Sequence, residues 1–163
     1  AARSCGAALR ERGLEPFAMV TGSRGIHVVV PLRRTRDVGE VLAWSRAFAA
    51  ELADGDPSLT TEFHKDKRDD RIYVDVARNG AAQTVVPPYA PRPRPGAPVA
   101  TPLRWEELGK LKSAAEFTIE TVPARLKALR RDPWEGFDEC PQTLTKKIQR
   151  QAAAMANGRT SES

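Results

Sequence analysis

Cysteine and histidine are scarce in this sequence, which has two of each among 163 residues. Cys5 and Cys140 stand near opposite ends of the chain, so a dense disulfide framework and a four-thiolate zinc site are both excluded. With only two histidines besides, we expect no structural zinc site. So few cysteines are typical of a protein from a reducing compartment.

Long apolar runs are missing as well. No stretch is long and apolar enough for a transmembrane helix, and the first residues have neither the apolar run nor the cleavage pattern of a signal peptide. The chain is 40% hydrophobic and 29% charged, with 26 basic against 21 acidic residues and a formal charge of +5. This composition is that of a globular domain of ordinary size, neither a membrane protein nor a disordered polymer.

Apolar periodicity and turn residues predict a mixed order of helices and strands. We expect a helix at the start that stops at Gly13, and a second helix from Thr35 to Asp54. Strands are expected at FAMVT, IHVVVPL, LTTEFHK, RIYVDVA and AQTVV, with Asn79-Gly80 as a hairpin turn. Seven prolines between residues 87 and 102 predict an extended loop. Beyond it we expect a short helix at 105–111, a strand at 117–122 and a helix at 123–131.

These elements predict the α+β class, with a mainly antiparallel sheet flanked by helices. The first helix has no N-cap residue before it, so we expect the chain to be part of a longer protein that begins upstream. Residues 1–141 are expected to carry the fold. We expect the polar residues 142–163 to form a C-terminal tail that is partly disordered.

The turn TGSRGIH is the first candidate site. Glycines let a backbone approach an anion, and the side chains of Thr21, Ser23, Arg24 and His27 can donate hydrogen bonds to phosphate oxygens. The turn is not a P-loop, because its spacing differs and a strand follows it. The alternative is an ordinary glycine hairpin with an exposed arginine and a structural histidine, and the turn alone favours this alternative.

Asp75 is the second candidate, because a carboxylate inside the expected strand RIYVDVA needs a partner. Either a divalent metal ion or a cross-strand arginine would stabilise it there. Structural ion pairs are common, so without further context the ion pair is favoured over the metal ion.

Two basic segments complete the set of candidates. The proline-rich loop PPYAPRPRPG holds Arg92 and Arg94 in a stiff segment suited to phosphate, or else is a connection packed on the core by Tyr89. The charged segment HKDKRDDR is either a solvated hairpin or a contact for a nucleic acid backbone. A phosphate-binding turn, a strand carboxylate, a rigid arginine loop and a basic hairpin together suit a metal–nucleoside triphosphate beside a polynucleotide.

Three blocks of sequence resemble the polymerase domain of bacterial ligase D, a member of the archaeo-eukaryotic primase superfamily that acts in non-homologous end joining. They are GLEPFAMVTGSRGIHVVVPL, then RIYVDVARNGAAQTVVPPYAPRPRPGAPVATPLRWEEL, and LKSAAEFTIETVPARL with DPWEGF. The resemblance implies that this chain is the C-terminal part of a primase-like catalytic domain lacking its N-terminal portion. It implies template-directed nucleotidyl transfer at DNA ends and gaps with a 5′-phosphate, with ribonucleotides preferred.

The resemblance also implies roles for individual residues. Asp75 and His27 would be catalytic, with Asp75 as a ligand of Mn²⁺ or Mg²⁺ in a two-metal site. The residues implied in nucleotide binding are Thr21, Ser23, Arg24, Gly25, His27 and Arg92, and those implied in DNA binding are Lys65, Lys67, Arg68 and Arg78. The partners it implies are DNA and nucleoside triphosphates, and it leaves open whether a DNA ligase domain and a DNA-end-binding protein join them. It implies no contact with a membrane, and a location in the bacterial cytoplasm at the nucleoid.

The sequence departs from the family at three points. Thr21 replaces the usual serine, Arg24 replaces the usual lysine, and no Asp-x-Asp motif precedes the first helix. Asp54 and Asp56 form a DGD, but in the wrong topological position. We therefore expect the metal site to be incomplete and these 163 residues alone to be inactive as a polymerase. The alternative function is a non-catalytic nucleotide- or DNA-binding fragment.

Overall fold

The computed structural model describes residues 1–148 and divides the chain into two compact units. One unit contains residues 2–31 and 85–142, and the other contains residues 32–84 together with the segment that starts at Thr143. The class predicted from the sequence, α+β with a mainly antiparallel sheet and helices, is confirmed. No helix in the described part of the chain is long and apolar enough to cross a membrane.

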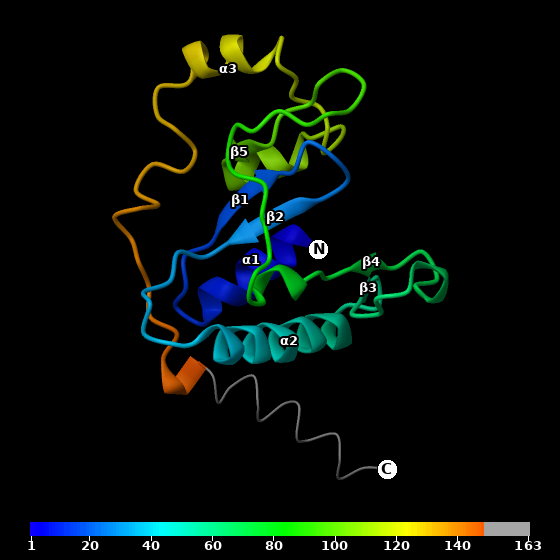
Figure 1. Cartoon of the computed structure of the whole chain (residues 1–163), viewed down its shortest axis with the longest axis vertical. Coiled ribbons are helices and arrows are strands. Elements are labelled where there is room, and N and C mark those ends of the chain that lie inside the picture. Colours follow the sequence, from blue (N-terminus) through cyan, green and yellow to red (C-terminus); the bar gives the residue numbers. More distant parts are fainter. Residues whose placement is uncertain (149–163) are drawn as a thin grey trace. The chain divides into compact units, whose positions relative to one another are not determined.

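The sheet unit is built on three antiparallel strands in the order β2-β1-β5 (Figure 1). These are β1 (Phe17–Val20), β2 (Ile26–Val29) and β5 (Thr101–Leu103). The central strand is buried along Ala18, Met19 and Val20, as its position between two neighbours requires. Pro102 lies within β5, where its missing N–H costs no ladder bond because β5 is an edge strand.

Helices and turns of the sheet unit largely follow the prediction. The helix at the start of the chain is α1 (Ala2–Glu11), and the helix after the proline-rich loop is α3 (Val122–Ala128), with proline in its first turn. A 3-10 helix, η3 (Trp105–Gly109), replaces the predicted short helix. The predicted strand at 117–122 is wrong: Thr118 makes one isolated bridge, residues 119–121 form a turn, and Val122 begins α3. The Thr118 and Thr121 hydroxyls bond nearby backbone groups and so compete with strand pairing.

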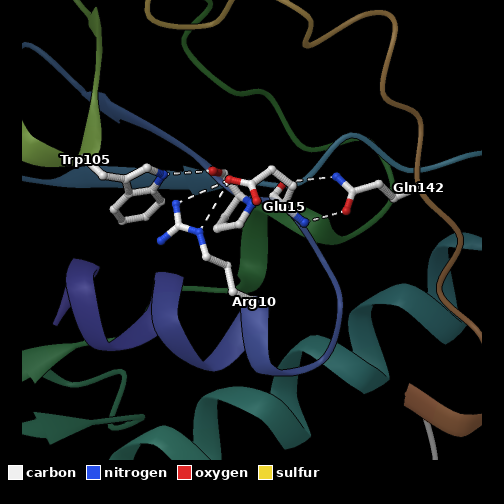
Figure 2. A network of polar contacts seen from close by, with 5 residues as sticks. Arg10, Glu15, Trp105 and Gln142 are labelled. Atoms are coloured by element: carbon white, nitrogen blue, oxygen red, sulfur yellow. Dashed lines mark hydrogen bonds and ion pairs between the residues drawn. The ribbon is translucent and has the colours of Figure 1, made fainter.

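Side-chain contacts connect distant segments of the sheet unit (Figure 2). Gln142 bonds both backbone groups of Glu15, accepting from its N–H at 2.5 Å and donating to its carbonyl at 2.9 Å. The indole N–H of Trp105 donates to the carbonyl of Pro16 at 3.0 Å. These bonds fix the connection between α1 and β1, and so the start of the central strand.

The helix unit is built on α2 (Val38–Gly55). Asp37 caps this helix and Glu40 bonds back to the Asp37 N–H, which is the reciprocal capping box expected from such a spacing. Phe48 and Ala49 are buried on α2, and the rings of Trp44 and Phe48 stack at 5.2 Å. The helix predicted from Thr35 to Asp54 is therefore confirmed within three residues at its start.

The strands of the helix unit are shorter than predicted. Only β3 (Leu59–Thr60) and β4 (Ile72–Tyr73) form, and they pair in parallel. Between them lies the 3-10 helix η1 (Lys65–Lys67), and after them the 3-10 helix η2 (Ala77–Asn79), which stands where an Asn-Gly hairpin turn was predicted. The strand predicted at AQTVV does not form: Ala82 has a left-handed φ of 56°, and Pro87 and Pro88 follow without N–H donors.

The predicted C-terminal tail begins with packed residues. Leu144 and Ile148 are buried, and the indole of Trp44 donates to the carbonyl of Ile148 at 3.3 Å. The rest of the tail, residues 149–163, lies outside the described residues. The boundary after residue 141 and the partial disorder of the tail remain predictions.

Candidate functional site

The glycine turn connects β1 to β2 and is closed by Thr21. The Thr21 N–H donates to the carbonyl of Gly25 at 3.0 Å, and the Thr21 Oγ1 lies 3.0 Å from that carbonyl and 3.3 Å from the Gly25 N–H. Ser23 is half-buried, whereas Arg24 and Gly25 are exposed at the tip. The turn is therefore a fixed backbone loop whose tip presents an arginine and an open glycine to solvent.

Arg92 packs directly on this turn, although 70 positions separate it from Gly22. A Cβ on Gly22 would lie 2.8 Å from Cγ of Arg92 and about 3.0 Å from the backbone of Val99 and Ala100. Gly22 also has a φ of 64°, in the left-handed region that favours glycine. Only glycine therefore fits between the turn and the segment that carries Arg92.

The side chain of Arg92 is held at the turn and keeps an unused hydrogen-bond donor. Its backbone N–H donates to the carbonyl of Pro98 at 2.7 Å, which fixes the loop. Its Nε is buried and has no hydrogen-bond partner among the described residues. A buried donor without an acceptor is costly, so this atom is one that an anion would satisfy.

His27 shares a sheet face with Thr21. His27 pairs with Met19 across the β1–β2 ladder, and residues two apart on a strand point to the same side. Thr21 follows Met19 at that spacing, so the Thr21 hydroxyl and the His27 imidazole stand on one face. The sheet unit thus brings together Thr21, Ser23, Arg24, Gly25, His27 and Arg92.

Asp75 lies outside the strand in which the sequence placed it. The strand β4 ends at Tyr73, and the Oδ1 of Asp75 accepts the N–H of Ala77 at 3.0 Å, which begins η2. Its side chain is exposed and makes no ion pair with any residue in the described range. The alternative expected from the sequence, an ion pair between Asp75 and a cross-strand arginine, therefore does not form within residues 1–148. One carboxylate oxygen holds the local turn, and the second accepts no hydrogen bond from residues 1–148.

The residues after Asp75 anchor it to α2. The Asn79 amide donates to the hydroxyl of Ser45 at 3.1 Å, and that hydroxyl donates to the Val41 carbonyl at 2.8 Å. Arg78 donates to the side chain of Gln83 at 3.2 Å and is exposed. Asp75 therefore has a defined position within the helix unit even though no regular strand holds it.

The basic segment of the helix unit is a turn held by its own arginines. Arg68 donates from Nε to the Glu62 carbonyl at 2.9 Å and from Nη2 to the Phe63 carbonyl at 2.6 Å. Its guanidinium carbon lies 4.3 Å from the ring centre of Tyr73. Burial and the nearby Asp75 carboxylate raise the pKa of Tyr73 above its ordinary value, so the phenol stays neutral at physiological pH. Lys65 and Lys67 on η1 are exposed.

The predicted site residues therefore fall into two groups, one in each unit. Asp75, Lys65, Lys67, Arg68 and Arg78 belong to the helix unit. Within residues 1–148 no group of three or more histidine, cysteine, aspartate or glutamate side chains is placed to hold a metal ion. Asp75 therefore belongs to no such group in that range.

Sequence reasoning missed two contacts that shape these groups. It did not find the packing of Gly22 against Arg92. The available signal was a glycine in the turn, at a position whose positive φ favours glycine. Sequence reasoning also missed Phe63, an aromatic ring that is 70% exposed next to the basic segment. Its position among charged residues was the signal, because a large apolar side chain in such a segment has no core to fill.

Residues 1–134 match the sequence profile of the family described as LigD, primase-polymerase domain. The chain is 32% identical over 145 residues to the multifunctional non-homologous end joining protein LigD of Pseudomonas aeruginosa, covering 88% of this chain and 17% of that protein. It is 29% identical over 117 residues to the bifunctional LigD of Bacillus subtilis, covering 71% of this chain and 19% of that one.

A solved structure has a similar fold. The polymerase domain of Mycobacterium tuberculosis ligase D, in complex with DNA, superposes with a TM-score of 0.77 at 26% sequence identity. The match covers 86% of this chain and 49% of that domain. The chain thus spans about half of the solved domain and less than a fifth of the curated relatives. The family resemblance inferred from the three sequence blocks is confirmed.

Proposed function

Because this chain belongs to the LigD primase-polymerase family, we propose that it is part of a template-directed nucleotidyltransferase. Its role there is to hold the triphosphate of the incoming nucleotide and to provide one carboxylate of the metal site. The observation that carries this proposal is the contact between the glycine turn and Arg92, whose buried Nε has no partner among the described residues. We assign the triphosphate to this contact.

The turn residues act by neutralising and orienting phosphate oxygens. Arg92 and Arg24 are permanent cations that bring positive charge to the turn, and guanidinium groups bond phosphate oxygens in pairs. The exposed backbone around Gly25 lets an oxygen approach, because no atom lies within 4 Å of where its Cβ would be. The side chains of Thr21, Ser23 and His27 donate further hydrogen bonds. Such positioning stabilises charge that develops as pyrophosphate leaves.

Asp75 is proposed as one ligand of Mg²⁺ or Mn²⁺, through the oxygen that does not bond Ala77. A divalent cation on phosphates normally takes more than one carboxylate, and within residues 1–148 Asp75 belongs to no group of three or more metal-ligating side chains. The described residues thus do not fit a two-metal site by themselves, and we derive no catalytic step through it. The complete site needs further carboxylates.

The substrates proposed for the whole protein are DNA ends and gaps with a 5′-phosphate, with ribonucleoside triphosphates preferred. The residues proposed to contact the nucleic acid backbone are basic side chains of the helix unit, with Lys65, Lys67 and Arg78 exposed and Arg68 half-buried. A ligase domain and a DNA-end-binding protein are proposed partners, and the bacterial nucleoid is the proposed location.

Nucleotide binding by the 163-residue chain tests the first part of this proposal. We expect Arg92→Ala to weaken binding of a fluorescent ribonucleoside triphosphate about 10- to 100-fold, as loss of a charged hydrogen bond predicts. Arg94→Ala is the matched control, because Arg94 is an exposed arginine in the same loop and should leave affinity within about twofold. Equal losses in both variants, or none in either, would contradict the role of Arg92.

Primer extension tests the second part. A gapped, 5′-phosphorylated DNA is incubated with Mn²⁺ and labelled ribonucleotides, using this chain and a longer protein that adds an Asp-x-Asp segment. We expect extension by the longer protein alone, and its loss in Asp75→Ala. Extension that survives Asp75→Ala would overturn the assignment of the carboxylate.

A non-catalytic nucleotide- or DNA-binding fragment is the second candidate. It is favoured by one observation, that Asp75 belongs to no group of three or more metal-ligating side chains among residues 1–148. If the longer protein also fails to extend the primer while Arg92 still governs nucleotide binding, this second function replaces the first.

A further inference from the structure

Phe63 is the most exposed large apolar side chain in the described part of the chain, with 70% of its surface accessible. Its ring centre lies 5.6 Å from that of His64 and 6.4 Å from that of Tyr73, with interplanar angles of 85° and 82°. Both contacts are edge-on, so neither ring lies parallel to Phe63. The faces of the exposed Phe63 ring are therefore not stacked on either neighbouring ring, so a planar group can stack on it.

The backbone that carries Phe63 is fixed. Arg68 donates two hydrogen bonds to consecutive carbonyls, those of Glu62 and Phe63, while its guanidinium lies over the ring of Tyr73. The Glu62 side chain accepts the N–H of His64 at 2.8 Å. The Phe63 ring is thus held out from the surface by a clamped main chain, which lowers the entropy that its ordering would cost on binding.

Exposed lysine side chains stand next to this ring, with Asp66 between them. Lys65 and Lys67 follow Phe63 on η1, both exposed and neither in an ion pair within residues 1–148. Aromatic rings next to basic groups that can track a phosphate backbone are the combination by which proteins bind single-stranded nucleic acid. A protein partner would also cover an apolar ring, but it gives no reason for the flanking lysines and the arginine clamp.

We propose that Phe63 is a stacking platform for an unpaired base of DNA, with Lys65 and Lys67 on the adjacent phosphates. This inference deepens the proposed function and rests on it for the identity of the polynucleotide. It predicts a preference for single-stranded overhangs over blunt duplex ends, since only an unpaired base presents a free face to the ring.

The test is equilibrium binding of the full 163-residue chain to labelled oligothymidylate of about 12 nucleotides, within the site size of such proteins. Phe63→Ala and Phe63→Leu should each weaken binding about 5- to 100-fold, and Phe63→Tyr should retain it. Ile119→Ala is the matched control, because Ile119 is also an exposed apolar residue, at 54%, but far from the basic segment in sequence. It should leave the affinity unchanged.

Two further readouts separate stacking from a loss of structure. The Phe63 variants should keep the wild-type salt dependence, because no charge is removed, whereas a Lys65→Ala, Lys67→Ala double variant should flatten its logarithmic slope by about 1.4. The fluorescence of a single 2-aminopurine in the oligonucleotide should be quenched on binding to the wild-type chain and to Phe63→Tyr, but not to Phe63→Leu.

The inference is overturned if wild-type chain does not bind the oligothymidylate at low salt, or if Phe63→Ala binds it as tightly as wild type. It is also overturned if Phe63→Leu retains full affinity, because that result indicates an apolar contact such as a protein partner would make. Primer extension is measured separately. If the longer protein does not extend the primer while binding still depends on Phe63, the proposed function is contradicted and this inference stands.

Discussion

In the sheet unit the candidate residues stand on or beside hydrogen-bonded strands, whereas in the helix unit they follow strands of only two residues. His27 and Thr21 are placed by the β1–β2 ladder, and Arg92 is placed by packing against Gly22. Asp75 is placed by the hydrogen bond that its carboxylate accepts from the Ala77 N–H. Phe63 is placed by the hydrogen bond that its carbonyl accepts from the Arg68 side chain. The candidate residues of the sheet unit are therefore placed mainly by backbone packing, and those of the helix unit by a few polar side chains.

The largest expected effect comes from filling the backbone contact in the sheet unit. Gly22→Val forces a β-branched residue to a φ of 64° and places its Cβ against Arg92 and the backbone of Val99. We expect it to destabilise the protein by about 2–4 kcal/mol and to abolish nucleotide binding. Chemical denaturation and a nucleotide titration measure the two effects.

Gly25→Ala is the matched substitution in the same turn. Gly25 has no left-handed φ, and no atom lies within 4 Å of its Cβ position. We expect stability within about 0.5 kcal/mol of wild type, and weaker nucleotide binding because the methyl group meets the phosphate. If both variants lose the same stability, the turn does not depend on its contact with Arg92.

The next largest effect is expected at the ion pair of the sheet unit. Arg125 holds Glu107 through bonds of 2.6 and 2.9 Å, with side-chain exposures of only 15% and 28%. Glu107→Gln should cost about 2 kcal/mol, because it leaves the half-buried guanidinium without its counter-charge. Asp69→Asn is the control in the helix unit, where the Arg71–Asp69 pair is exposed and should contribute nothing measurable.

The pH dependence of this pair follows from the pKa of Glu107. Burial raises that pKa, but the bonds from Arg125 and the Arg104 N–H outweigh burial and hold it below its ordinary value of 4.5. A lowered folded-state pKa adds stability that is complete above 4.5 and is lost as the pH falls through the folded-state value. Thermal melts should therefore show the gap between wild type and Glu107→Gln shrinking below about pH 4.5. A constant gap would contradict this account.

The smallest expected effect concerns Asp75. Asp75→Asn keeps an oxygen that can accept the Ala77 N–H, so we expect stability to change by less than about 0.5 kcal/mol. Asp75→Ala removes the acceptor and should cost about 1 kcal/mol. Both should abolish Mn²⁺-dependent extension by the longer protein. If Asp75→Asn extends a primer normally, Asp75 only bonds the Ala77 N–H and is not a metal ligand.

The sequence predicted the elements whose signals are local. The helix α2, the glycine turn between β1 and β2, and the proline-rich loop all follow from residues within a few positions of one another. The three family blocks likewise identified the family from contiguous residues. Predictions were wrong at 117–122 and at AQTVV, where threonine hydroxyls and paired prolines compete with strand formation.

Single-residue placement in the candidate site depended on more distant contacts. Alternation along RIYVDVA placed Asp75 inside a strand, but β4 ends at Tyr73 because only β3, itself two residues long, pairs with it. Periodicity describes which faces a strand would have, and it does not say whether a partner is present to make the strand.

The amino-acid sequence by itself determined the class of fold, the family and the residue types of the candidate site, because these depend on local patterns and on contiguous motifs. Only the tertiary structure decided that Arg92 packs on Gly22 and that Glu107 pairs with Arg125. Each of these depends on which distant segments meet, and long-range contacts leave no periodic signal in the chain that makes them.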